Sequence, residues 1–212
     1  MSNRQWFKDR LNDPYLKRAR REDYRSRAAY KLTEILDKYR FIKKGMNVLD
    51  IGAAPGSWSQ VAREALGPSG RLVAVDLLPI QPIEGVTIFQ GDIRDPSIQA
   101  RIAEHVGTGF HVILSDMAPD TTGIHFADTE ASAELVHLVL DQCERWLRRD
   151  GAMVAKVFEG QEYRALLQRA KQRFSLAKSF SPKASLSRSR EVFLVAQGFK
   201  GTEQQPPGKL PT

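Results

Sequence analysis

Short apolar runs alternate along the chain with segments whose apolar residues recur at helical spacing. The apolar runs, which predict strands, cover residues 47–51, 71–76, 86–93, 110–116, 152–158, 174–180 and 191–197. The helical patterns cover residues 26–39, 57–66, 96–106, 135–147 and 161–173. This alternation is typical of α/β proteins, and it predicts a doubly wound, mostly parallel sheet of seven strands.

The first apolar run leads into a glycine-bearing turn, from Gly52 to Gly56, and a helical pattern follows at once. Nucleotide sites of α/β proteins begin in this way, because glycines let the backbone approach a ligand and the helix directs free N–H groups at it. A dinucleotide fits poorly, since Ala54 and Ser57 stand where the G-x-G-x-x-G pattern requires glycine. The turn therefore predicts a nucleotide-like ligand other than a dinucleotide.

Carboxylates follow the next two apolar runs. Asp76 ends the second run roughly 20 residues beyond the turn, where such folds bind a ribose diol, so it is a candidate ribose ligand. The alternative that Asp76 only caps the next turn stays open. Asp92 lies at the end of the third run, and we expect it to contact the rim of a purine.

Three segments carry a family resemblance: 50–59 (DIGAAPGSWS), 115–119 (SDMAP) and 155–158 (AKVF). Together they resemble the FtsJ family, over about residues 25–197. Its members are S-adenosyl-L-methionine-dependent ribose 2′-O-methyltransferases that act on bacterial large-subunit ribosomal RNA. The resemblance implies a Rossmann-like class I methyltransferase fold, S-adenosyl-L-methionine as cofactor, and ribosomal RNA or the large subunit as partner. The cofactor residues it implies, together with those above, are Gly52, Gly56, Trp58, Asp76, Asp92 and Asp116.

Lys156 stands in the middle of an apolar run, where an unpaired ammonium is costly to bury, so it needs partners. Asp116 ends a neighbouring run and Glu191 begins the last one. From the residues alone, an ion-pair network that only joins sheet to loop stays open. The resemblance implies instead that Lys31, Asp116, Lys156 and Glu191 surround the target ribose hydroxyl. We expect Lys156 to accept its proton or orient it, and Glu191 to be the least essential.

The net charge of +7 is concentrated at the start of the chain, where residues 1–44 hold 14 Lys or Arg against 6 acidic residues. Residues 1–24 mix these charges with aromatic side chains, a combination that binds RNA phosphates and unstacked bases. We expect a loosely ordered RNA-binding arm there, with a solvated tail as the alternative. A methyltransferase domain over residues 25–200 and a disordered tail over 201–212 follow. The stretch 178–190, which holds no acidic residue, predicts a second basic patch.

Composition excludes several classes of protein. The single cysteine, Cys143, cannot form an internal disulfide, which indicates a reducing compartment. The four histidines lack metal-ligand spacing, so we expect no metal. No run reaches the roughly 20 apolar residues that cross a bilayer, and the N-terminus is unlike a signal peptide. We expect a cytoplasmic monomer that is not bound to a membrane.

Four alternative functions share parts of this pattern. An NAD(P)-linked oxidoreductase shares the fold but requires the missing glycine pattern. A base-amino methyltransferase requires an Asn/Asp-Pro-Pro-aromatic turn, whereas this chain has DMAP at 116–119. A non-catalytic RNA-binding module would transfer no methyl group. A ribose methyltransferase for transfer RNA or messenger caps would share the chemistry and differ in substrate.

Overall fold

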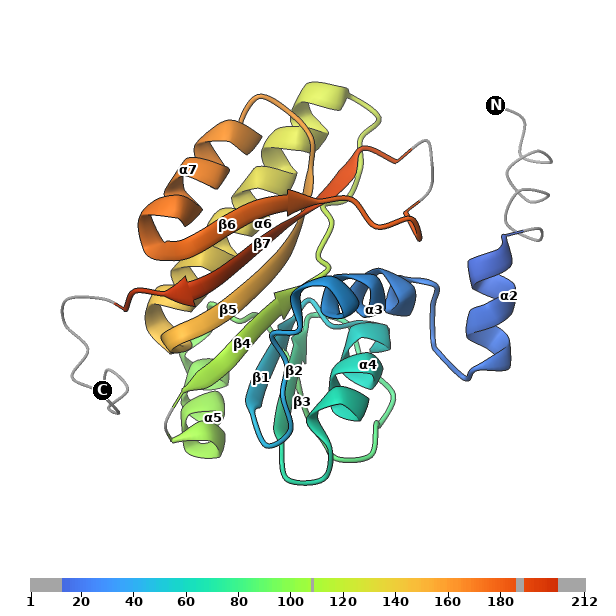
Figure 1. Ribbon diagram of the computed structural model, residues 1–212, viewed down its shortest axis with the longest axis vertical. Helices are drawn as coiled ribbons and strands as arrows, with labels where there is room; N and C mark the ends of the chain where they lie inside the picture. Colours follow the sequence, from blue (N-terminus) through green and yellow to red (C-terminus); the bar gives the residue numbers. More distant parts are fainter. Residues whose placement is uncertain (1–12, 108, 186–188, 202–212) are drawn as a thin grey trace.

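A seven-stranded sheet forms the centre of the computed structural model, which describes residues 13–107, 109–185 and 189–201 (Figure 1). The strand order is β3-β2-β1-β4-β5-β7-β6. The strands are β1 (Asn47–Ile51), β2 (Arg71–Asp76), β3 (Val86–Gln90), β4 (Phe110–Ser115), β5 (Leu147–Phe158), β6 (Phe174–Phe180) and β7 (Glu191–Phe199). Strands β3, β2, β1, β4 and β5 pair in parallel, while β7 is antiparallel to β5 and β6. The predicted fold class is confirmed.

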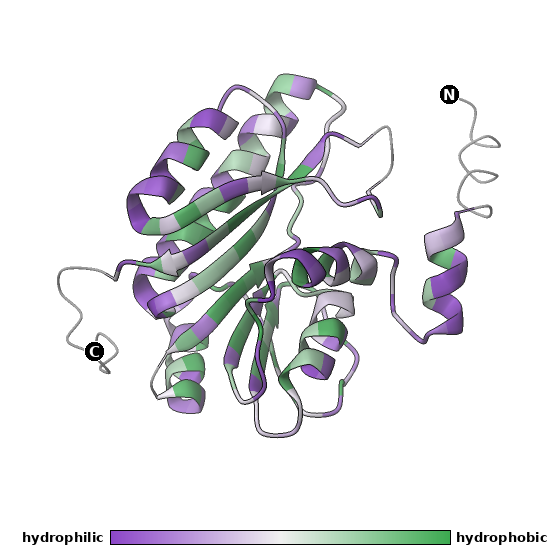
Figure 2. Ribbon diagram, viewed as in Figure 1, coloured by the Kyte–Doolittle hydropathy of each residue, from purple (hydrophilic) through white to green (hydrophobic). Residues whose placement is uncertain are grey.

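Helices cover both faces of the sheet. They are α2 (Pro14–Arg21), α3 (Ala28–Tyr39), α4 (Ser57–Leu66), α5 (Pro96–Val106), α6 (His125–Trp146) and α7 (Tyr163–Arg173). Alternate strand residues face opposite layers: Val154 packs with α3 and α4, and Met153 packs with α5, α6 and α7. Most strand residues are hydrophobic, whereas the helices combine hydrophobic and hydrophilic residues (Figure 2). Within the described ranges no helix is both long and apolar enough to span a membrane.

One edge of the sheet collects the ends of several strands. The carboxyl ends of the parallel strands meet there, and the antiparallel β7 begins at the same edge, because Glu191 pairs with Phe158 at the end of β5. The chain order also reverses between β1 and β4, which lie side by side. Doubly wound sheets bind ligands in the crevice at such a point. Residues that follow β1 and β4, or begin β7, are therefore brought to one place.

The beginning of the described chain is helical. The Asp13 carboxylate accepts hydrogen bonds from the backbone N–H groups of Tyr15 (2.9 Å) and Leu16 (3.3 Å), and Pro14 occupies the first helical position of α2. Ala19 of this helix packs with Tyr30. The expectation of a loosely ordered arm is therefore wrong for α2. Residues 1–12 and 202–212 of the predicted arm and tail lie outside the described residues.

Two other element boundaries differ from the prediction by five residues or more. Helix α6 begins at His125, ten residues before the predicted start, because its first turns bury small or polar side chains such as Thr129 and Ser132 that an apolar pattern does not detect. Strand β5 begins at Leu147, five residues early, where an irregularity in its pairing with β4 accommodates exposed charged residues at 148–150. Neither difference changes which residues reach the sheet edge described above.

Candidate active site

The turn between β1 and α4 depends on its two glycines. Gly52 has φ +71°, and a Cβ there would lie 2.0 Å from the Cγ atom of Met117. Gly56 has φ +107° and caps the first turn of α4. Both positions combine a backbone conformation that favours glycine with a close neighbour, so a larger side chain would displace the turn.

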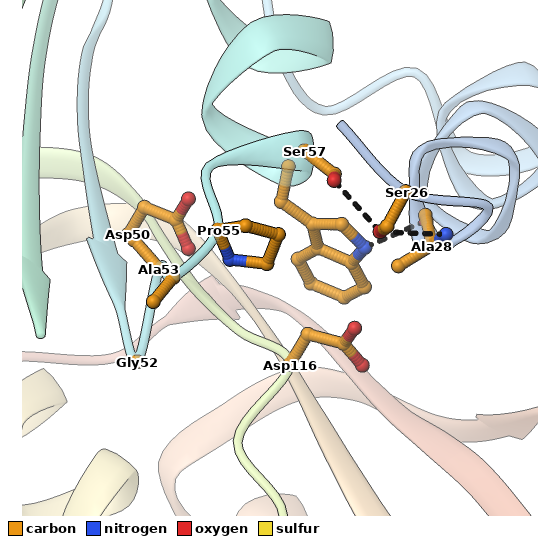
Figure 3. A pocket seen from close by; sticks show the side chains of 10 residues that line it. Ser26, Ala28, Asp50, Gly52, Ala53, Pro55, Ser57 and Asp116 are labelled. Carbon is orange, nitrogen blue, oxygen red and sulfur yellow. Dashed lines mark hydrogen bonds between the residues drawn. The ribbon is translucent and has the colours of Figure 1, made fainter. Parts of the chain in front are cut away.

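A pocket lies beside this turn (Figure 3). Its lining consists of Ser26, Ala28, Asp50, Gly52, Ala53, Ala54, Pro55, Ser57, Trp58 and Asp116. Three of the predicted cofactor residues, Gly52, Trp58 and Asp116, are in this lining. Gly56, Asp76 and Asp92 are not, although all three belong to the described chain. Their assignment to a cofactor stays a prediction.

Asp76 and Asp92 have different surroundings. The Asp76 carboxylate accepts hydrogen bonds from the N–H groups of Ala54 and Leu78, each at 2.8 Å, so it fixes the glycine turn and the start of the next loop. This is the capping role that the sequence left open. The Asp92 carboxylate instead forms an ion pair with Arg94 at 2.6 Å, and this contact lowers its pKa. Asp76 thus holds Ala54 of the pocket lining without lining the pocket itself, and Asp92 is held by a neighbour in sequence.

Asp50 is a pocket residue that the sequence analysis missed. Its side chain is fully buried in β1, and its Oδ2 atom accepts a hydrogen bond from the Ser59 hydroxyl at 2.6 Å. Its Oδ1 atom has no hydrogen-bond partner within the described chain. Burial raises the pKa of Asp50 to about 7, against the effect of the Ser59 hydrogen bond, and the charges of Asp116 and Asp76 add to the rise. An acceptor that faces the pocket without a partner is suited to a cationic ligand.

Trp58 joins the pocket to the segment that precedes α3. Its indole N–H donates a hydrogen bond to the carbonyl oxygen of Ala28 at 2.9 Å, and its ring packs against Phe193 of β7 at a centroid distance of 5.6 Å. Trp58 is buried, so burial and the satisfied N–H fix its orientation. Trp58 therefore joins pocket residues from α4 and the start of α3, and β7 supports its ring from outside the pocket lining.

Lys156 is held by Asp116 at the sheet edge. Its ammonium lies 3.0 Å from the Asp116 Oδ1 atom and donates a hydrogen bond to the Asp116 carbonyl oxygen at 2.5 Å. The Lys156 side chain is 9% exposed. Oδ1 is in ion-pair contact with this ammonium but completes no hydrogen bond within the described chain. Asp116 therefore fixes the lysine while its carboxylate still faces the pocket (Figure 3).

Lys31 and Glu191 form a second ion pair beside the first, with 2.5 Å between the Lys31 ammonium and Glu191 Oε1. The same oxygen accepts a hydrogen bond from the Ser185 hydroxyl at 2.7 Å. Burial by itself would raise the pKa of Glu191, but the positive charges of Lys31 and Lys156 outweigh it and hold that pKa below its ordinary value. The four charges predicted from the sequence thus lie in one neighbourhood as two pairs, in which each lysine has its own carboxylate.

The comparisons with known proteins identify the family. The family model described as FtsJ-like methyltransferase matches residues 24–199, which include the glycine turn and all four charged residues. The chain belongs to this family. The resemblance proposed from the sequence is therefore confirmed, and a methyltransferase is favoured over an NAD(P)-linked oxidoreductase.

Relatives of this FtsJ-like chain match along nearly its whole length. A protein of Variovorax paradoxus named ribosomal RNA large subunit methyltransferase E is 42% identical over 210 residues, 95% of each chain. A protein of the same name from Cellvibrio japonicus is 44% identical over 203 residues, 95% of this chain and 96% of its own. A crystal structure of a Plasmodium falciparum protein described as a ribosomal RNA methyltransferase has a TM-score of 0.78 at 32% identity, covering 84% of this chain and all of that one.

Two basic segments of the FtsJ-like chain, helix α2 and the loop between β6 and β7, pack together against α3. Arg27, at the start of α3, pairs with the Asp13 carboxylate and donates to the carbonyl oxygen of Ala184. Helix α2 and the loop between β6 and β7 are thereby tied to the helix that carries Lys31. Glu34 holds the same loop through the N–H groups of Lys183 (2.7 Å) and Ala184 (2.9 Å).

Proposed function

We propose that the protein transfers the methyl group of S-adenosyl-L-methionine to a ribose 2′-hydroxyl of 23S ribosomal RNA, at a uridine of the assembled large subunit. The observation that carries this proposal is the pairing of Lys156 with Asp116 beside the pocket, with Lys31 and Glu191 next to them. The names of the relatives support large-subunit ribosomal RNA as the substrate. Uridine rests on the family resemblance alone.

The residues of the pocket fit the proposed cofactor. S-adenosyl-L-methionine is a sulfonium cation, and it would supply an activated methyl group. Asp50 offers a buried oxygen without a partner in the described chain, and Asp116 adds a second carboxylate to the same lining. Two carboxylates in a largely enclosed site favour a cationic ligand, because the surrounding protein screens their charge less than water does. The glycine turn leaves room for close approach of a ligand to the backbone.

The remaining residues would act on the ribose hydroxyl. Methyl transfer forms an oxygen–carbon bond as the sulfur–carbon bond breaks, and the hydroxyl must lose its proton. In the proposed reaction an unprotonated Lys156 amine takes that proton. The ammonium that results is the form that pairs with Asp116 in the structure, so Asp116 stabilises the outcome of proton transfer. The charge of Lys31 is matched by Glu191, and this pair borders the hydroxyl site from α3 and β7.

The basic segments would hold the RNA. Helix α2 carries four Lys or Arg residues, and phosphate contacts from such side chains provide affinity without sequence selection. The protein would act as a monomer, and a ribosomal substrate would place it in the cytoplasm.

The test is transfer of tritiated methyl groups from S-adenosyl-L-methionine to RNA from a strain that lacks the protein. We expect incorporation into large subunits, mapped to one ribose of 23S RNA, and much less into free 23S RNA. Transfer RNA and capped RNA serve as competing substrates. Incorporation into one of these in place of ribosomal RNA would support the proposed methyl-transfer reaction and refute ribosomal RNA as its substrate. Absence of incorporation into any RNA would overturn the proposed activity.

A further inference from the structure

The segment that links α2 to α3, residues 23–28, is attached to the first turns of α4. Gln60 accepts a hydrogen bond from the Arg25 N–H at 3.0 Å and donates one to the Asp23 carbonyl oxygen at 2.9 Å. The hydroxyl groups of Ser26 and Ser57 share a hydrogen bond of 2.7 Å (Figure 3). Because Ser26 and Ala28 line the pocket, this segment forms a wall of it that the sheet and its crossover helices do not supply.

Arg25 bridges two loops from within this segment. Its Nη1 atom donates to the carbonyl oxygens of Pro55 and Gln81, each at 2.8 Å, and its Nη2 atom donates to that of Pro82 at 2.8 Å. Pro55 belongs to the turn that follows β1, and residues 81–82 belong to the loop that follows β2. All three acceptors are backbone carbonyl groups, so the guanidinium fixes the course of the chain in both loops.

The guanidinium also packs directly on the glycine turn. A Cβ at Gly56 would lie 2.7 Å from Arg25 Nη1 and 2.8 Å from the Cδ1 atom of Ile83. The glycine turn, Arg25 and the loop after β2 are thus in close contact. No space remains between them for a side-chain atom at Gly56. A change in the position of Arg25 must therefore move at least one of the two loops.

We propose that Arg25 is a positioning residue for the methyl donor and is not a contact for RNA phosphate. It sets the spacing between the loops that follow β1 and β2, so that the donor meets a wall that is already ordered and loses less free energy in ordering it. The inference rests on the proposed function. It assigns an arginine in a strongly basic part of the chain to the donor side of the reaction.

The test is to measure S-adenosyl-L-methionine binding by calorimetry in wild-type protein and in Arg25→Ala. We expect the dissociation constant to rise roughly tenfold, because the variant lacks the hydrogen bonds from a charged donor to two loops. The KM for the donor should rise with it, while kcat at saturating donor and the affinity for ribosomal RNA should stay within about twofold of wild type. Arg25→Lys should recover part of the loss, since one ammonium can reach fewer of the three carbonyl groups than the guanidinium fork.

Arg63→Ala is the matched control. Arg63 also donates to two backbone carbonyl groups, those of Gly70 at 2.8 Å and Gly85 at 3.2 Å, and Gly85 lies at the far end of the same loop. This variant should melt at a lower temperature with donor affinity unchanged. If Arg63→Ala lost donor affinity to the same extent, the loss in Arg25→Ala would be explained by general destabilisation of the fold and not by positioning of the donor.

Three other results would overturn the inference. In the first, Arg25→Ala binds the donor as tightly as wild type but binds RNA more weakly and with a smaller salt dependence. That result would make Arg25 a contact for RNA phosphate. If Arg25→Ala does not fold, Arg25→Lys decides, and wild-type donor affinity and KM in that variant would refute the bridging role. Wild-type protein that binds no S-adenosyl-L-methionine would refute the proposed function and this inference together.

Discussion

Ser59 donates a 2.6 Å hydrogen bond to one carboxylate oxygen of Asp50, and the other oxygen faces the pocket without a partner in the described chain. The carboxylate is fully buried. A buried group with one of its two oxygens unsatisfied is costly to ionise, which is why its pKa is raised to about 7. In a methyltransferase this cost is offset when a cation binds beside it. The ionisation of Asp50 should therefore make the stability of the fold depend on pH and on the binding of the donor.

Asp50→Asn should remove a pH dependence of stability. Between about pH 4 and 7 the folded wild-type protein keeps a proton on Asp50 that the unfolded chain has lost, so its free energy of unfolding should fall by about 1.4 kcal/mol per pH unit relative to the variant. Above the folded pKa the difference should level off. Urea unfolding of both proteins at pH 5, 6, 7 and 8 measures it, and parallel curves would contradict the raised pKa.

The two carboxylates predicted for the cofactor should differ in importance. Asp76→Ala removes the acceptor for two backbone N–H groups of the pocket wall, so donor affinity should fall by about tenfold or more. Asp92→Ala removes the partner of the exposed Arg94, and donor affinity should change by less than threefold. Titration of both variants with S-adenosyl-L-methionine tests the ranking. The reverse order would make Asp92 the donor residue.

Signals for the missed features were present in the sequence. Asp13 and Pro14 begin α2 by the same capping arrangement with which Asp95 and Pro96 begin α5, a helix that the pattern over 96–106 predicted. Likewise, the cost of burying a charge singled out Lys156 and applies equally to Asp50, which lies within an apolar strand. In each of these two pairs, both positions carry the same sequence signal.

Other features could not be read from the pattern. Which strands are neighbours depends on long-range pairing, and only the antiparallel insertion of β7 brings Glu191 to the end of β5. Periodicity also does not show that Lys31 pairs with Glu191 and Lys156 with Asp116, because partner choice depends on side-chain positions across α3 and the sheet. The sequence predicts the four charged residues of the site, but which residues pair with each other depends on the three-dimensional fold.

Charge reversal on α2 should separate RNA binding from donor binding. Lys17 and Arg20 are exposed, whereas Arg18 is engaged with Glu22, so Lys17→Glu/Arg20→Glu removes free charges without breaking that ion pair. The double variant should bind ribosomal RNA more weakly, and the slope of log affinity against log salt should fall by about 1 for each phosphate that the variant no longer binds. Donor affinity should not change.

The control for that variant is Arg164→Glu/Lys171→Glu, which reverses two exposed charges on α7. Helix α7 covers the face of the sheet opposite to α3 and α4 (Figure 1). Filter binding at several salt concentrations compares the two double variants. An equal loss of RNA affinity in both would mean that net charge alone governs binding and that α2 has no special part.

Lys156→Ala should abolish methyl transfer and leave donor affinity nearly unchanged, because the lysine is proposed to act on the ribose hydroxyl in the transition state. Loss of a positioned proton acceptor lowers kcat by roughly 10²–10⁴. Glu191→Gln should cost clearly less, since it keeps the hydrogen-bonding shape of the Lys31 pair and loses only its charge. Single-turnover transfer to large subunits measures both, and Lys171→Ala, at an exposed position of α7, is the control.

The pH dependence of the same reaction tests how Lys156 acts. If Lys156 takes the proton, the pH–rate profile of the wild-type protein should differ from that of the residual rate of Lys156→Ala, because the variant lacks the proton acceptor. Each variant must first be shown to fold by circular dichroism and to bind the donor, because the lysine is 9% exposed within β5. A folded Lys156→Ala protein with near wild-type turnover would assign the proton to Asp116, whose carboxylate faces the same pocket, and would leave the four charges as structural ion pairs.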